Sequence, residues 1–461
     1  MKKIIIIGDG IAGLSAGVYA QRCGFDAIIF ESHNIAGGNC TAWKRGDYLF
    51  EGGMHWLTGS RSQDPLNQLW HSIGALNDDV IIDYSEPYVE WDDHGTPIRF
   101  YRNIDRTQQH LLALSPADTK EIKALCDSIR RLQDGMEVDA IYYQLPEQYI
   151  KRFSHEGIRE LLRAIKEDDQ GIPIVYTLGR LANGDGGFPE GGSLPFVRRI
   201  VKTFISLGGK IQYNARVDRI ILENDKATGV ISGDELIPAD AVIVTSDTML
   251  IDQLFDTPPK ASWLDEMRAV INPTMCTIVS LGINADLKHY PKKPIFKLTE
   301  PIYLADLTYN YLSPTKYAIT PIYSPNGKTA MTIFLSGDSY DFWKKMKEEN
   351  RYVDEKQRIA NQVIAAIIAQ MPEVDGKIEV CDVATPLTYE RYCGTWKGSW
   401  MTVIGPNART KPYPTVIKGL NGVYFAGQRI MPPGGLPNAM LTGMKAVQRL
   451  CRDTNIPFVK E

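Results

Sequence analysis

The sequence lacks the long apolar runs that a membrane-spanning segment requires. Its uncharged apolar stretches, such as 4–7 and 363–369, are far too short to cross a bilayer. Lys2 and Lys3 precede the first stretch, as basic residues do in a signal peptide, but the stretch ends after four isoleucines at a glycine turn. We therefore expect a first buried strand at this place and no cleaved signal.

Cysteine pairs with the spacing of a redox or metal site are also missing. The seven cysteines are scattered, odd in number and never form C-x-x-C, which predicts a reducing, cytoplasmic location without disulfides. With 51 basic and 55 acidic residues the net charge is −4, so we expect no nucleic-acid partner. The histidines show no metal-ligand spacing, and no metal is expected. Hydrophobic residues at 44% and charged residues at 23% are ordinary for a soluble globular protein.

A glycine-rich turn follows the first apolar stretch. Residues 3–7 form a β-branched run, typical of a strand buried on both faces of a parallel sheet, and Gly8-Asp9-Gly10-Ile11-Ala12-Gly13 gives the pattern G-x-G-x-x-G. Residues 14–21 predict a helix, and 26–30 predict a second strand that ends at Glu31. Strand, turn, helix and strand together predict a Rossmann-like unit.

This unit predicts a site for an adenosine diphosphate moiety. Gly8 permits the tight turn, Gly10 lets the backbone approach a pyrophosphate, and Gly13 lets the helix pack close to the strand. The helix N-terminus offers free N–H groups and the positive end of its dipole to phosphates. Glu31 is placed to accept hydrogen bonds from ribose hydroxyls and disfavours a 2′-phosphate.

A second glycine-rich segment lies near the other end of the chain. Residues 422–427 predict a strand that ends at Gly427, and Gly434-Gly435-Leu436-Pro437-Asn438-Ala439 follows a proline-containing loop. Pro437 suits the first turn of a helix, which we expect to continue to about Arg452. A glycine-lined helix N-terminus can stabilise an anion through backbone donors and its dipole.

These motifs resemble those of the phytoene desaturases, carotenoid isomerases and retinol saturases, a family within the amine-oxidase-like flavoproteins. The resemblance rests on the two glycine-rich segments, on Gly37-Gly38 with the residues that follow, and on 46–53. It implies non-covalently bound FAD, with Gly37-Gly38 around the diphosphate and Gly434-Gly435 facing the flavin. The implied cofactor-binding residues are Gly8, Gly10, Ile11, Ala12, Gly13, Glu31, Ser32, Gly37, Gly38, Asn39, Gly53, Met54, His55, Val217, Gly427, Gln428, Gly434, Gly435, Leu436 and Asn438.

The middle of the chain predicts a discontinuous α/β architecture. A helix at 194–206, a strand at 210–213, a three-stranded meander over 217–238 and a strand at 241–245 return the chain to the Rossmann-like sheet. We expect a Rossmann-like FAD-binding domain formed by three blocks and an α+β substrate cap of mixed sheet and helices. The expected blocks are 1–75, 186–284 and 401–461 for the FAD-binding domain, and 76–185 and 285–400 for the cap.

We call the two cap blocks, 76–185 and 285–400, the first and second insertions. Two of their features bear on function. Five tyrosines of the second insertion are typical either of a half-buried sheet or of a wall for a large apolar ligand. They are Tyr303, Tyr309, Tyr311, Tyr317 and Tyr323. The glycine cluster at 183–187 follows no strand and predicts a loop, so we expect no built-in NAD(P)H domain and an external electron donor or acceptor.

Two side chains are candidates for a direct part in the reaction. His55 follows a glycine-containing stretch that the resemblance places beside the flavin, where it can donate or accept a proton; a structural histidine is the alternative. Arg391 lies in a block that the family places near the substrate channel; a salt-bridged anchor is the alternative. Desaturases more often carry aspartate where this chain has Glu51.

The resemblance implies an FAD-dependent oxidoreductase that acts on C–C or C=C bonds of a lipophilic polyene, isoprenoid or other lipid. Desaturation, saturation and isomerisation all remain open, with hydride passing to or from flavin N5. A flavin amine oxidase and a flavin-free prenyl or lipid carrier of the same fold are the alternatives. The intact glycines and Glu31 argue against the carrier. A lipophilic substrate leads us to expect peripheral contact with a membrane.

Overall fold

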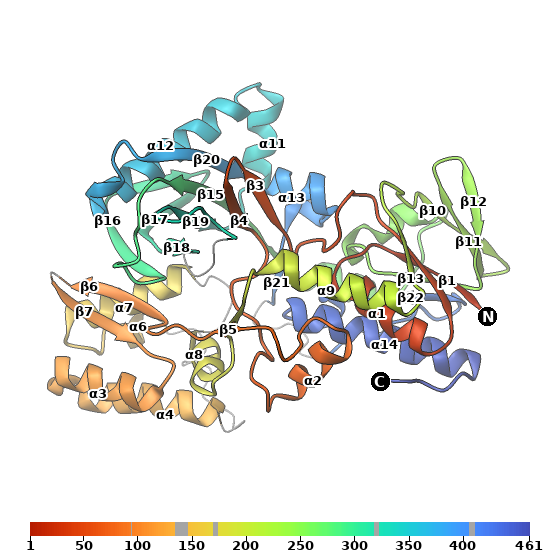
Figure 1. The fold of residues 1–461 in the computed structure, drawn as a ribbon, viewed down its shortest axis with the longest axis horizontal. Coiled ribbons are helices and arrows are strands. Elements are labelled where there is room, and N and C mark those ends of the chain that lie inside the picture. The colour runs from red at the N-terminus through yellow and green to blue at the C-terminus, as the bar shows by residue number, and fades with distance from the viewer. Residues whose placement is uncertain (94, 134–145, 169–173, 318–321, 405–410) are drawn as a thin grey trace.

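The computed structural model describes residues 1–461 except 94, 134–145, 169–173, 318–321 and 405–410. The two chain ends lie at the same end of the molecule, beside the first strand, and the sheet that contains residues 294–312 lies at the opposite end (Figure 1). Of the helices within the described residues, none combines the length and the apolar character needed to cross a bilayer.

A five-stranded parallel sheet forms the core beside the chain ends. Its strand order is β22-β13-β1-β2-β9. Ile5 of β1 lies between Ile28 and Val242 of the neighbouring strands and is completely buried, as expected for a strand covered on both faces. This arrangement confirms the predicted Rossmann-like unit. The strands are β1 (Lys3–Ile7), β2 (Asp26–Phe30), β9 (Lys210–Gln212), β13 (Ala241–Val244) and β22 (Val423–Phe425).

Helices from both ends of the chain pack against each other beside this sheet. α1 (Ile11–Arg22) contacts α14 (Leu436–Thr454), and α9 (Ser193–Ser206) lies next to α1. The approach is close, because a Cβ on Gly443 of α14 would lie 2.3 Å from the carbonyl oxygen of Ala12. The Ser15 hydroxyl donates a buried hydrogen bond of 2.9 Å to the Met440 carbonyl. The first and last motifs of the sequence therefore belong to one packed unit.

The predicted meander forms an antiparallel sheet beside the parallel one. Its order is β10-β11-β12, and Asn224 and Asp225 at its first turn adopt the left-handed conformation. The strands are β10 (Arg219–Glu223), β11 (Lys226–Ser232) and β12 (Glu235–Pro238).

A second sheet with the order β18-β19-β15-β20 carries helices of the second insertion. β15 is buried along its whole length and pairs with β19 and β20. We therefore propose a boundary before residue 276, whereas the expected FAD-binding block extends to 284; the rest of the domain division stays a prediction. The elements are β15 (Cys276–Ile283), β18 (Thr315–Lys316), β19 (Thr329–Ser336), β20 (Ile378–Ala384), α11 (Tyr340–Glu348), α12 (Tyr352–Gln370) and α13 (Pro386–Cys393).

A third sheet joins the two insertions. Its order is β17-β16-β6-β7, with β6 and β7 from the first insertion and β16 and β17 from the second. The strands are β6 (Val89–Asp93), β7 (Thr96–Phe100), β16 (Pro294–Leu304) and β17 (Leu307–Leu312). The helices of the first insertion are α3 (Ile104–Leu114), α4 (Thr119–Gln133), α6 (Glu147–Ile150), α7 (Glu156–Asp168) and α8 (Ile174–Ala182).

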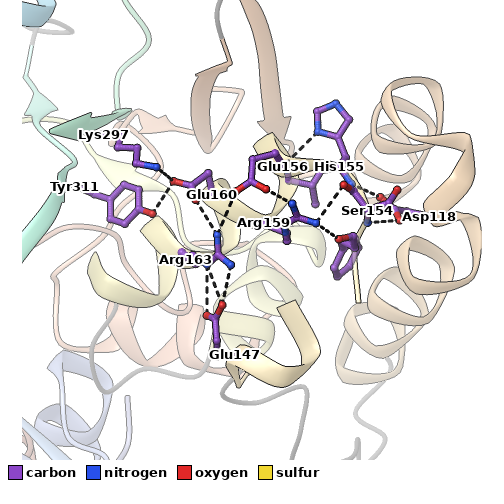
Figure 2. A network of polar contacts seen from close by, with 12 residues as sticks. Asp118, Glu147, Ser154, His155, Glu156, Arg159, Glu160, Arg163, Lys297 and Tyr311 are labelled. Carbon is purple, nitrogen blue, oxygen red and sulfur yellow. Dashed lines mark hydrogen bonds and ion pairs between the residues drawn. The ribbon is translucent and has the colours of Figure 1, made fainter. Parts of the chain in front are cut away.

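A polar network fastens α7 to this third sheet (Figure 2). Glu160 of α7 accepts a hydrogen bond of 2.8 Å from the Tyr311 hydroxyl and forms an ion pair with Lys297 at 2.7 Å. Arg163 pairs with Glu160 and with Glu147 of α6, both at 2.8 Å. A network of Glu147, Glu160 and Arg163 in the first insertion thereby connects to β16 and β17 of the second.

The remaining elements are short and connect these layers. They are β3 (Ala42–Arg45), β4 (Tyr48–Glu51), β5 (Ile82–Asp83), β8 (Phe188–Pro189), β14 (Ile271–Thr274), β21 (Met401–Ile404), α2 (Pro65–Ser72), α10 (Ser262–Val270), and the 3-10 turns at 116–118, 248–254, 372–374, 396–398 and 428–430. The 183–187 cluster is a loop, as predicted, and its buried Asp185 carboxylate accepts the backbone N–H groups of Gly59 and Ser60.

Candidate cofactor and substrate site

A large cavity lies between the parallel sheet and the second sheet. Its volume of about 1280 Å³ exceeds the ~300–1,000 Å³ of common small-ligand pockets, so it has room for more than one small ligand. We call its lining by Gly8, Gly10, Glu31 and Val217 the nucleotide part, and its lining by Trp43, Tyr389 and Trp400 the aromatic part.

The nucleotide part is built on the turn between β1 and α1. Gly8 has a φ of +97°, a conformation that favours glycine, and a Cβ on Gly13 would lie 1.9 Å from the Gly8 carbonyl oxygen. A Cβ on Gly10 would meet nothing within 4 Å, because this residue faces the open cavity. The turn therefore brings bare backbone and the N-terminus of α1 to the cavity wall.

Glu31 lies at the end of β2 and faces the same part of the cavity. Its carboxylate accepts the backbone N–H of Asp9 at 2.9 Å and that of His33 at 2.8 Å, and the Ser32 hydroxyl at 3.2 Å. These contacts hold an acceptor in place beside the glycine turn. The following loop bridges Gly37 to Gly10, so the glycine doublet lies directly against the turn.

The glycine segment near the C-terminus lines the same cavity through Gly427, Gln428 and Gly435. Gln428 links this segment to Trp400 and to the start of α14. Its amide nitrogen donates to the Trp400 carbonyl at 3.0 Å, and its amide oxygen accepts the Gly435 N–H at 3.0 Å. The Gly427 N–H donates to the Thr442 hydroxyl of α14 at 3.0 Å. The segment is thus held by Gln428, an expected cofactor-binding residue, and by Thr442, which the sequence does not mark.

A buried ion pair holds this segment to the loop after β13. Arg429 and Asp247, each with a side chain only 3% exposed, contact one another at 2.6 Å. Arg429 also donates to the hydroxyls of Thr402 and Ser399 at 2.9 and 2.6 Å. The Asp247 carboxylate accepts the Trp396 N–H at 2.8 Å. Both charges are therefore paired and hydrogen-bonded, as a buried ion pair requires.

The aromatic part is built from three separate segments. A Cβ on Gly52 would lie 2.2 Å from the ring of Trp43 and 2.9 Å from the Tyr389 hydroxyl oxygen, so these two rings close over a bare backbone. The Tyr389 hydroxyl donates to the Gly52 carbonyl at 2.8 Å, and the Trp43 N–H donates to Asp382 at 2.9 Å. Burial raises the pKa of Tyr389, which keeps this phenol neutral and a hydrogen-bond donor.

Glu51 lies behind this wall and does not line the cavity in the described residues. Its carboxylate is completely buried and accepts the Gly53, Met54 and Ser193 N–H groups at 3.3, 3.2 and 3.0 Å, together with the hydroxyls of Ser193 and Tyr323. Burial raises its pKa, and these hydrogen bonds oppose the rise. Glu51 therefore fastens the 52–54 turn to the start of α9.

The structure brings most of the expected cofactor residues together. The expected residues that line the cavity are Gly8, Gly10, Ile11, Ala12, Glu31, Ser32, Gly37, Gly38, Asn39, Gly53, Val217, Gly427, Gln428, Gly435 and Leu436. Gly13, Met54, His55, Gly434 and Asn438 lie next to this lining in the chain without forming part of it. The individual roles of all these residues stay predictions.

His55 and Arg391, the two candidates for a direct part in the reaction, lie at different distances from the cavity. His55 packs its ring against Phe334 and Trp400, with ring centroids 4.4 and 5.5 Å apart, just behind the cavity wall. Arg391 is exposed on α13 and stacks over Tyr392 at 5.2 Å. Within the described part of the chain Arg391 forms no ion pair and does not line the cavity. The structure therefore does not bring Arg391 to the site.

The five tyrosines of the second insertion lie outside the cavity lining, as far as the structure describes it. Tyr309 and Tyr311 belong to β17, and Tyr303 to β16, where it is 53% exposed. Tyr317 and Tyr323 stack on one another with ring centroids 5.0 Å apart and lie buried near Glu51. Tyr303, Tyr309 and Tyr311 agree with the sheet interpretation, whereas Tyr317 and Tyr323 lie outside the strands.

The parallel sheet, the glycine turn and the acid at the end of β2 define a Rossmann-type dinucleotide-binding protein. A model of the NAD(P)-binding Rossmann-like domain matches residues 6–73, and a model of the flavin-containing amine oxidoreductases matches residues 152–451. The chain belongs to the family of flavin-containing amine oxidoreductases. It is a flavin-dependent oxidoreductase, and the predicted family resemblance is confirmed.

Curated relatives are similar over nearly the whole chain. The 1-hydroxycarotenoid 3,4-desaturase of Flavobacterium sp. is 24% identical over 99% of this chain and 100% of its own length. Prolycopene isomerase of Daucus carota is 22% identical, covering 98% and 80%. All-trans-retinol 13,14-reductase of Danio rerio is 22% identical, covering 86% and 76%.

Solved structures share the fold. A putrescine oxidase variant has a TM-score of 0.64 at 14% identity, covering 98% of this chain and 99% of its own. Cyclohexylamine oxidase of Brevibacterium oxydans has a TM-score of 0.61 at 15% identity, with the same coverage. These identities establish a common architecture only.

Two buried polar atoms of the cavity wall agree with a bound cofactor. The side-chain oxygens Oδ1 of Asn39 and Oγ1 of Thr395 are buried and have no hydrogen-bond partner among the described residues. Both residues line the cavity, and so does the unobstructed face of Gly10. Buried polar atoms normally find partners, and the open backbone at Gly10 leaves room at the cavity wall for the polar groups of a ligand. A dinucleotide fits this requirement.

Proposed function

We propose that the chain binds FAD non-covalently and oxidises, reduces or isomerises C–C or C=C bonds of a lipophilic polyene, isoprenoid or related lipid. The observation that carries this proposal is the single cavity that joins the Rossmann turn to a wall of aromatic rings. A dinucleotide alone does not need that wall, whereas an extended apolar substrate does. The curated relatives named for carotenoid and retinol substrates support the same substrate class.

The residues of the chain divide between holding the cofactor and shaping the substrate path. Glu31 and the N-terminus of α1 would hold the adenosine and diphosphate, and the start of α14 would face the flavin. FAD, when bound, supplies the acceptor or donor of a hydride. Trp43, Tyr389 and Trp400 would hold an apolar chain beside it and exclude water.

Ionisable side chains lie beside the rings: Lys44, Arg45, Asp382 and Glu390 line the same cavity, and Asp382 accepts the Trp43 N–H. Tyr389 stays protonated, and burial raises the pKa of the cavity-lining Cys393 thiol to about 12, so neither supplies a nucleophile at neutral pH. His55 remains the nearest candidate for proton transfer, from its place behind Trp400. An external electron donor or acceptor completes the reaction.

Anaerobic spectroscopy of the purified protein tests the proposal. We expect a yellow protein whose flavin is released as FAD on denaturation. Its oxidised flavin should bleach with a polyene, or its photoreduced flavin should re-oxidise with one. The first result indicates desaturation and the second saturation. A product isomer formed without net bleaching indicates isomerisation.

Two outcomes would overturn the proposal. Bleaching by primary amines and not by polyenes would indicate an amine oxidase, in agreement with the putrescine and cyclohexylamine oxidase folds. A colourless protein that binds no added FAD yet retains lipid would indicate a carrier. Membrane contact and a cytoplasmic location are further parts of the proposal, tested by binding to lipid vesicles and by cell fractionation.

A further inference from the structure

Asp9, the second residue of the glycine turn, is an acid between two residues that line the cavity, Gly8 and Gly10. Its side chain is completely buried. Oδ1 accepts the Gly37 N–H at 3.3 Å, whereas Oδ2 is buried and meets no donor among the described residues. A second acid, Glu31, lies against it, because the Asp9 N–H donates to Glu31 at 2.9 Å.

No side-chain cation balances these two acids in the described structure. Neither Asp9 nor Glu31 forms an ion pair among the described residues, while Tyr213 after β9 acts on both acids and Cys393 of α13 acts on Glu31. Tyr213 and Cys393 are neutral at pH 7, since the pKa of each is raised to about 12. The N-terminus of α1 supplies a partial positive charge beside them, and a bound diphosphate would occupy it.

Two adjoining carboxylates without a cation cannot both stay ionised beside a diphosphate. We propose that Asp9 is a neutral positioning residue, whose proton is donated to Glu31 and holds that carboxylate ready for ribose hydroxyls. Burial raises the pKa of Asp9 to about 10, and the charge of Glu31 and the hydrogen bond between the two carboxyls act in the same direction.

The arrangement also explains how Glu31 keeps room for a ribose. A carboxylate has about four acceptor sites. The Asp9 and His33 N–H groups take two of them, and the proposed proton takes a third. The remaining contact comes from the exposed Ser32 hydroxyl at 3.2 Å, which a ribose hydroxyl can replace.

The test compares D9N with D9A by the dissociation constant for FAD, measured by flavin fluorescence from pH 6 to 10.5. Asparagine can donate to Glu31 without ionising, so D9N should bind FAD as the wild type does at pH 7.5, and D9A about tenfold more weakly. Above the titration of Asp9 the wild-type constant should rise about tenfold per pH unit relative to D9N. D234N, in the exposed turn between β11 and β12, is the control.

Equal weakening in D9N and D9A, or the same pH profile in D9N and wild type, would overturn the proposal. A second measurement needs no variant: NMR of wild-type protein with ¹³C at the aspartate carboxyls. One resonance should titrate above pH 8, because the pKa of Asp9 is raised to about 10, whereas the pKa values of Asp83, Asp118 and Asp286 are lowered. Titration of every aspartate below pH 6 would contradict it.

The inference rests on the proposed binding of FAD, and the two can fail separately. If no variant binds FAD at any pH, the proposed function fails, while the carboxyl resonance still shows whether Asp9 is neutral. If wild type and D9N both bind FAD but no aspartate titrates above pH 8, the role of Asp9 fails and the cofactor assignment stands.

Discussion

In the nucleotide part of the cavity the groups that face a ligand are mostly backbone atoms of neighbouring residues, whereas in the aromatic part they are side chains from distant segments. The turn of Gly8 to Gly13 is continuous in sequence. Trp43, Tyr389 and Trp400 come from three places in the chain. A site made by continuous backbone is visible as a motif, and a site made by converging side chains becomes visible only after folding.

Breaking the Asp247–Arg429 ion pair tests whether the two parts of the cavity depend on one another. This change should have the largest effect on stability. D247A leaves a buried guanidinium without its partner, which should lower the free energy of unfolding by about 3–5 kcal/mol. Chemical denaturation measures this loss. D256A, which breaks the exposed Arg219–Asp256 pair, should cost no more than ~1 kcal/mol. Equal effects would show that the buried pair is not needed to hold the segments together.

Two glycines of one turn separate packing from ligand binding. G13A forces a methyl group against the Gly8 carbonyl and should destabilise the protein by roughly 1–3 kcal/mol. G10A places its methyl group in the open cavity, so stability should hold while FAD affinity falls. Denaturation curves and flavin titrations of both variants distinguish the two effects. A stable G10A that binds FAD normally would mean that the diphosphate does not pass Gly10.

The pH dependence of stability tests the protonation state of Asp9 beside the nucleotide part. The unfolded Asp9 carboxyl ionises near 3.8 and the folded one near 10, so the unfolded state binds fewer protons between these pH values. This group therefore lowers the free energy of unfolding as pH rises, by up to ~1.4 kcal/mol per pH unit. D9N should remove that slope. Parallel stability–pH curves for wild type and D9N would contradict a raised pKa.

A change in the aromatic part should affect substrate and spare cofactor. W43A removes one ring and should leave FAD content unchanged, while the KM for a polyene rises by about tenfold, an effect of ~1.4 kcal/mol. Steady-state kinetics and the flavin spectrum give the two readings. Y303A, at an exposed tyrosine of β16, is the matched control. Loss of flavin in W43A would mean that the two parts are not separable.

The sequence predicted the Rossmann-like unit, the meander and the helix after Gly435 because each has a local pattern of glycine, β-branched and polar residues. It did not indicate the Asp247–Arg429 pair, since 182 residues separate its members and a single acid or base has no pattern of its own. Trp43 was missed because an isolated aromatic residue has no pattern either, and Tyr389 lies in the block of Arg391 but was not singled out. The only local signal at Asp9 was an acid inside a phosphate-binding turn.

The sheet to which β15 belongs is a second feature that the sequence alone could not predict. A buried apolar strand is compatible with either sheet, and its pairing with β19 and β20 depends on partners far along the chain. Arg391 shows the limit of a block resemblance, because Glu390 and Tyr392 of that block line the cavity while the Arg391 side chain is exposed.

The packing of α14 on α1 has a consequence for biosynthesis. Gly443 and Met440 touch the helix that carries the first motif, so the wall of the cavity formed by Gln428, Gly435 and Leu436 exists only once residues near 450 have been translated. A nascent chain on the ribosome presents an open half-site for most of its synthesis. We therefore expect a chain stalled on the ribosome before α14 to retain flavin poorly, because this wall of the cavity is missing.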